Sequence, residues 1–82
     1  MDSEYIKEIC SGNINKLKQF PKSKINNLLL SELLNNMEYN KNELKQSLNE
    51  NIYSCDNKYI IIYKMNKIND IDECIFYLKK IT

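Results

Sequence analysis

The sequence predicts a small α+β domain with the element order α-α-α-α-β-β-α. Two observations lead to this fold class. Apolar residues recur at the helical spacing of three and four over most of the chain. Residues 51–65 alternate instead with a period of two, as strands do. At 82 residues, the chain has room for one domain, and residues 1–82 are expected to form it.

A helical hairpin is predicted over residues 2–20. Asp2 and Ser3 can cap a first helix, and Gly12, the only glycine, follows that helix where a left-handed residue is favoured. Asn13 can cap a second short helix. Pro21 should end it, because the residue before a proline is pushed out of the helical region.

A helix-turn-helix unit is predicted over residues 23–49. Its first helix should begin at Ser23 and is apolar over well over half of its circumference, which is typical of a central helix. Asn40 and Glu43 have the spacing of a capping box, and Tyr39 lies where a hydrophobic staple would form. A second helix with a polar outer face is therefore expected to start there.

A β-hairpin is predicted over residues 51–65, with Asp56 and Asn57 as its two-residue turn. Asn69 should then cap a C-terminal helix over residues 69–81, whose acidic first turn and basic last turn suit the helix dipole. The hairpin is apolar on both faces. Either the flanking helices or another chain must therefore cover its second face.

Charge and composition argue against several kinds of site. The 12 lysines and 11 acidic residues are evenly spread, so no basic stripe is available for phosphate. Arginine, the usual bidentate ligand of phosphate and guanine, is absent. Without histidine no Cys–His or Ser–His nucleophile can form, and a single glycine excludes a glycine-rich phosphate loop. The chain is therefore expected to be no enzyme and to hold no cofactor or metal.

The three cysteines indicate a reducing compartment. Cys10, Cys55 and Cys74 are odd in number and far apart, which suits neither a disulfide framework nor a zinc site. With no signal peptide and no apolar segment of membrane-spanning length, a soluble cytoplasmic protein is expected, with the nucleus or a host cell as alternatives. The excess of asparagine, isoleucine and lysine indicates an AT-rich genome.

The element order over residues 23–65 resembles a winged helix, in which the second helix of the pair reads DNA and the hairpin forms the wing. The resemblance covers about half of the chain and rests on element order alone. It implies a regulator that binds nucleic acid, which neutral charge and missing arginine make the alternative rather than the first prediction. The base-facing residues would be Lys41, Asn42, Lys45, Gln46 and Asn49.

Surplus apolar surface makes a non-catalytic protein–protein interaction module the first prediction. The hairpin has two apolar faces, and Phe76 lies opposite the apolar stripe of its own helix. Leftover aromatic surface on a small protein is typical of contact sites. An accessory or regulatory subunit is expected, binding another protein or a second copy of itself, and no membrane. The predicted contact residues are Tyr53, Tyr59, Ile60, Ile62 and Phe76.

Overall fold

Helices account for nearly all of the described chain. The computed structural model describes residues 3–54 and 58–82, and of residues 51–54 it describes only the backbone. No strand occurs in these ranges. The predicted α+β fold class is therefore wrong, and the part of the chain that the structure describes is all-α.

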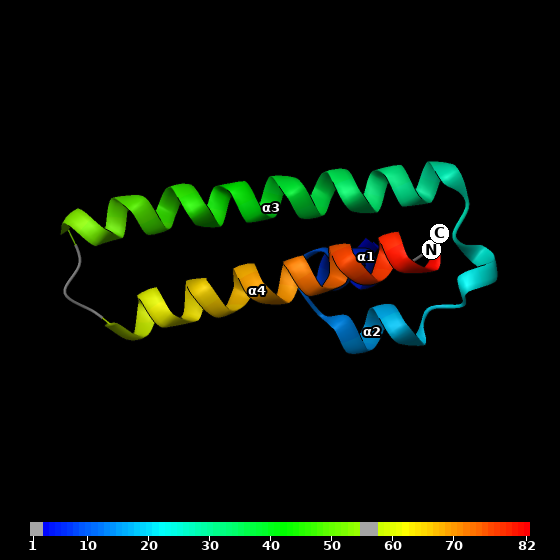
Figure 1. Cartoon of the computed structure of the whole chain (residues 1–82), viewed down its shortest axis with the longest axis horizontal. Coiled ribbons are helices and arrows are strands. Elements are labelled where there is room, and N and C mark those ends of the chain that lie inside the picture. Colours follow the sequence, from blue (N-terminus) through cyan, green and yellow to red (C-terminus); the bar gives the residue numbers. More distant parts are fainter. Residues whose placement is uncertain (1–2, 55–57) are drawn as a thin grey trace.

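The architecture is a long helical hairpin with two short helices packed against one end of it. Helices α3 (Asn27–Ser54) and α4 (Lys58–Ile81) run antiparallel (Figure 1). Helices α1 (Ser3–Cys10) and α2 (Ile14–Gln19) lie beside the C-terminal half of α4. The molecule is elongated, with extents of 45 × 24 × 19 Å.

The turn between α1 and α2 agrees with the sequence-based prediction. Gly12 has a φ of 111°, in the left-handed region that glycine adopts without strain. Asn13 caps α2, and its side-chain oxygen accepts a hydrogen bond from the Lys16 amide at 3.1 Å. The backbone is extended at Phe20, directly before Pro21. A 3₁₀ turn, η1 (Lys22–Lys24), then leads towards α3.

The predicted helix-turn-helix unit is wrong, because α3 continues through the predicted turn without a break. Asn40, Glu43 and Tyr39 all lie inside α3 instead of forming a cap. The residue that caps α3 is Asn26, whose side-chain oxygen accepts a hydrogen bond from the Leu29 amide at 2.8 Å. No glycine or proline interrupts the chain after residue 21. Extending the helix therefore adds a hydrogen bond per residue, which a capped break would lose.

The predicted β-hairpin over residues 51–65 is also wrong. Its first strand falls in α3 as far as Ser54, and its second strand falls in the first half of α4. The predicted turn, Asp56 and Asn57, lies outside the described residues. Asn69, the predicted cap of the last helix, lies inside α4. The cause is the run of three isoleucines, because a short apolar run fits a strand and a buried helix equally well.

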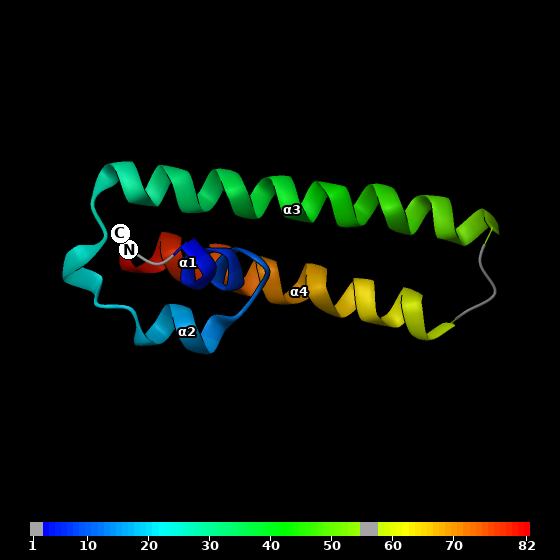
Figure 2. The ribbon, with the colours of Figure 1, turned by 180° about the vertical axis from the view of Figure 1, so that it is seen from behind.

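The core sits at the end of the hairpin that α1 and α2 cover. Helix α1 contacts α2, α3 and α4, and α2 contacts α4. None of the described residues 38–50 and 58–70 is buried. We call residues 45–54 of α3 and 58–68 of α4 the arm; it projects beyond α1 and α2 (Figure 2). The buried residues are Ile9, Cys10, Leu17, Leu33, Met37, Ile71, Cys74, Ile75 and Leu78.

Candidate protein-interaction surface

The arm consists of two helices that shield only one side of each other. Leu48 of α3 and Ile61 and Ile68 of α4 are half-buried. The Lys64 ammonium donates a hydrogen bond to the Ser47 hydroxyl and so joins the two helices. Domains normally bury their apolar surface between two packed layers. The arm supplies a single layer, and none of the side chains described in it is buried.

A cluster of large apolar side chains is exposed at the start of α4. Tyr59 is 84% exposed, Tyr63 60% and Ile62 53%, and Met65 and Ile60 are 50% and 40% exposed. We call these five residues the α4 patch. They lie within seven consecutive positions, whereas the remaining large exposed apolar residues of the described chain, Leu28, Tyr39 and Phe76, are scattered. Helix α4 is thus apolar on its outer side as well, a pattern typical of a helix with neighbours all round.

Three of the five predicted contact residues come together in the patch. Tyr59, Ile60 and Ile62 belong to it. Phe76 is 70% exposed, but it lies about 16 Å further along α4 than the end of the patch. The side chain of Tyr53 lies outside the described residues.

Two residues of the patch were missed by the prediction. Tyr63 and Met65 belong to it, and in the predicted strand both would share a face with Tyr59. Tyr59 and Tyr63 are four positions apart, so they share one side of a helix and would also share one face of a strand. Either period therefore groups Tyr63 with Tyr59, which was among the predicted contact residues.

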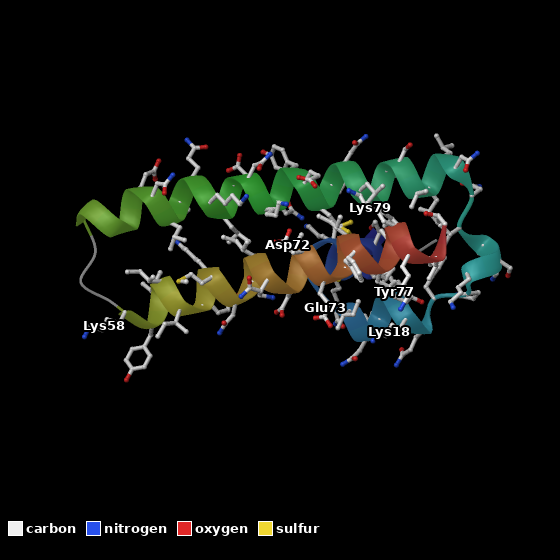
Figure 3. All side chains as sticks on the ribbon, viewed as in Figure 1. Lys18, Lys58, Asp72, Glu73, Tyr77 and Lys79 are labelled. Carbon is white, nitrogen blue, oxygen red and sulfur yellow. The ribbon has the colours of Figure 1, made fainter. Side chains whose placement is uncertain are left out.

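Lysines surround the patch on α4. Between residues 58 and 69 there are three lysines and no acidic residue. The Lys67 ammonium lies 5.7 Å from the centroid of the Tyr63 ring, within the range of a cation–π contact. Lys58 lies at the far end of the hairpin (Figure 3), in a first turn without an acidic residue to suit the helix dipole. The apolar centre therefore has a basic rim on this helix.

An open groove connects the patch to the covered end of the hairpin. The groove has a volume of about 550 Å³ and is lined by Lys7 and Ser11 from the α1 end, by Glu43 of α3, and by Tyr63 and Lys67 of α4, among others. Tyr63 thus lies at the border of α1. At Tyr63 the patch therefore meets the face of the hairpin that α1 covers at the other end.

The residues of the nucleic-acid alternative lie on α3. The Lys41 side chain is only 16% exposed, because its ammonium bonds the Asp72 carboxylate at 2.9 Å and approaches Glu38 at 3.6 Å. Figure 3 shows Asp72 between the two long helices. The hydrogen bond to Asp72 raises the pKa of Lys41. Since the wing is absent from the described chain, the winged-helix arrangement is wrong. The other residues of this set, Asn42, Lys45, Gln46 and Asn49, are exposed.

The cysteine thiols of the core are poorly suited to chemistry. Cys10 and Cys74 are free and buried. Burial raises the pKa of Cys10 and raises that of Cys74 to about 11. Both are therefore protonated near neutral pH, and the thiol is a weaker nucleophile and ligand than the thiolate. Cys55 lies outside the described residues.

No metal centre or membrane span emerges from the part of the chain that the structure describes. Its cysteine and acidic residues form no group of three or more that could hold a metal ion. None of its helices combines the length and the apolar character needed to cross a membrane. Comparisons with protein-family models, with curated proteins and with solved structures found no match to this chain.

Proposed function

We propose that this protein is a small interaction module that binds a protein partner through the α4 patch. One observation carries the proposal. The described residues 38–50 and 58–70 include no buried residue, yet five large apolar side chains are exposed between residues 59 and 65. Covering such surface is favourable by roughly 25 cal/mol per Å². A partner helix or helical pair laid along the arm would supply the missing second layer.

The rim of the patch indicates what the partner should present. Lys58 and Lys67 flank the apolar centre, and Glu43 lies across the groove from Lys67. Charged groups at the rim of an interface mainly tune association rate and specificity. A partner should therefore bring an apolar helical face with acidic groups at its edge.

The test compares two tyrosines of nearly equal exposure. Tyr63 of the patch is 60% exposed and Tyr39 of α3 is 64% exposed, so Tyr63→Asp and Tyr39→Asp disturb similar sites. In pull-downs with the tagged chain from its native host, Tyr63→Asp should reduce recovery of the bound protein at least tenfold, and Tyr39→Asp should leave it unchanged. Circular dichroism verifies that both variants remain helical. Equal recovery with both variants would contradict the proposed surface.

Nucleic-acid binding is separated from this proposal by one further measurement. The chain is titrated against random-sequence duplex DNA at about 50 mM salt, where contacts to phosphate are strong. We expect no binding. Binding that weakens steeply with added salt and is lost on Lys45→Ala, but not on Tyr63→Asp, would favour the nucleic-acid alternative instead.

A further inference from the structure

We infer that the end of the molecule away from the arm is a basic surface that binds membranes of anionic lipid. Two segments of the sequence, 9–31 and 74–82, contain no acidic residue but six of the twelve lysines. The rest of the chain has the other six lysines and all eleven acidic residues. The lysines of the two segments are Lys16, Lys18, Lys22, Lys24, Lys79 and Lys80. Positive charge is therefore concentrated in these segments, although the whole chain is nearly neutral.

The fold brings the two segments together. Residues 9–31 include α2 and η1, and residues 74–81 are the end of α4. Helix α2 contacts α4, and α2, η1 and the end of α4 all lie away from the arm (Figure 1, Figure 2). Figure 3 shows Lys18 of α2 and Lys79 of α4 at this end of the molecule. We call the six lysines the basic end. The sequence predicted no membrane partner; the basic end arises only when the two segments meet in the fold.

Five of the six lysines are available to a partner. Lys16 is bonded to Glu8 of α1. The other five are exposed and form no ion pair with an acidic residue that the structure describes. Glu4 and Glu32 line hollows beside α1, on its side towards α3, and Glu73 marks the border of the basic end on α4. The surface of α2, η1 and the end of α4 therefore carries a clear excess of positive charge.

Exposed apolar side chains among the lysines favour a lipid surface over nucleic acid. Phe76 is 70% exposed, and Leu28, which follows η1, is 80% exposed. Phe76 precedes Lys79 and Lys80 by three and four positions, so these three residues share one side of α4. Apolar side chains can enter the headgroup region of a bilayer while lysines contact its phosphates, but the backbone of a duplex offers them no apolar surroundings. Without arginine, the chain also lacks the residue best suited to bidentate phosphate contacts.

The distribution of charge orients the molecule on such a membrane. Each lysine close to an anionic bilayer increases the partition coefficient about fivefold. This attraction falls off within about 10 Å at about 0.1 M salt, so only the lysines that face the bilayer contribute. The arm lies at the other end of the molecule (Figure 1). The α4 patch therefore lies away from the membrane and stays accessible to a protein partner.

Co-sedimentation with vesicles tests the basic end. We expect the wild-type chain to bind vesicles made of equal parts of phosphatidylcholine and phosphatidylserine at about 0.1 M salt, and not to bind phosphatidylcholine alone. Lys22→Gln with Lys24→Gln should lower the partition coefficient at least about tenfold. Lys45→Gln with Lys58→Gln changes the net charge equally, at exposed positions of the arm, and should leave binding nearly unchanged. No binding by wild type, or an equal loss in both double variants, would overturn the basic end.

Tryptophan fluorescence separates a bilayer from other polyanions. The chain has no tryptophan, so Phe76→Trp adds a single reporter at the basic end, and Tyr39→Trp adds one at a similarly exposed position of α3. With the phosphatidylserine vesicles, the emission of Phe76→Trp should shift to shorter wavelength because the ring enters the headgroup region, and that of Tyr39→Trp should not. An unshifted emission of Phe76→Trp, or tighter binding of wild type to duplex DNA or polyglutamate at the same salt, would overturn the lipid partner.

The basic end and the α4 patch are independent surfaces, so each can fail without the other. Tyr63→Asp should bind vesicles as wild type does, and Lys22→Gln with Lys24→Gln should capture the protein partner as wild type does. Loss of vesicle binding in Tyr63→Asp would place the membrane contact on the arm and overturn the basic end.

Discussion

Gly12 determines how closely the turn after α1 approaches α4. A Cβ atom at this position would lie 2.9 Å from the Cβ of Asp70 and 3.4 Å from backbone atoms of α4. The φ of 111° adds a conformational penalty for any other residue. Gly12→Ala should therefore lower the free energy of unfolding by at least about 1 kcal/mol, because left-handed backbone alone costs about that much.

Urea denaturation of Gly12→Ala would measure this cost, with Asn15→Ala as the control. Asn15 is exposed on α2, where alanine is the better helix former, so its replacement should be neutral or slightly stabilising. Midpoints that are equal for Gly12→Ala and wild type would show that the turn can move away from α4 without cost.

Cys74 makes the stability depend on alkaline pH. Burial first, and the charges of Glu73 and Asp70 next, raise the pKa of the folded thiol from 9.0 to about 11. The unfolded chain loses this proton first as the pH rises, so the contribution is complete below pH 9 and is lost between about pH 9 and 11. The free energy of unfolding should fall over that range.

The alkaline loss is measured by urea denaturation at pH 7, 9 and 10.5. Lys41 acts in the same direction, because its pKa is also raised in the folded state, from 10.5. Comparison with Cys74→Ala isolates the thiol, since that variant should lose less stability between pH 9 and 10.5. Parallel pH profiles for wild type and Cys74→Ala would assign the loss to other groups.

Among the helices, α3 differs most from the prediction because it is one continuous helix, and Tyr39→Pro tests this continuity. In the predicted helix-turn-helix unit, Tyr39 would precede a helix cap, where proline is tolerated. Inside α3, proline removes a hydrogen bond and clashes with the preceding turn, at a cost of about 3 kcal/mol or more. Thermal unfolding followed by circular dichroism should show a strong loss for Tyr39→Pro. Tyr39→Ala is the control, since 64% exposure leaves little packing to lose; a similar Tm for both variants would contradict a continuous helix.

The turn and the helix cap that were predicted correctly depend only on residues close to them in the sequence. Gly12 and Asn13 act within one turn of their own positions, and both have the predicted roles. The pair Asn40 and Glu43 has the composition of a cap, but a cap forms only where the helix ends, and packing of α3 along α4 keeps the helix going. The run of three isoleucines was ambiguous because it suits a strand and a helix equally well. Packing against the neighbouring helix, rather than the isoleucines themselves, decides that this segment is helical.

At the scale of the whole molecule, the sequence indicated that apolar surface would be left over, and the arrangement of helices decides where. Tyr59, Ile60 and Ile62 were predicted because the expected hairpin is apolar on both faces. Tyr63 joins them only because α1 and α2 are too short to reach the arm. How far two short helices extend along a hairpin is a property of tertiary packing, and the residues of the patch do not encode it by themselves.

Hydrogen exchange should divide the hairpin at the border between core and arm. Amides of residues 30–41 and 70–80 belong to the segments that hold the buried side chains of the long helices, whereas residues 45–50 and 58–68 have no buried side chain. Local opening needs less free energy where fewer apolar contacts are broken. In dilute protein the arm should exchange at least about tenfold faster than the core segments, which corresponds to roughly 1.4 kcal/mol. Equal protection of arm and core in dilute wild-type protein would contradict the division of the hairpin, because it would mean that two helices hold the arm as firmly as four hold the core.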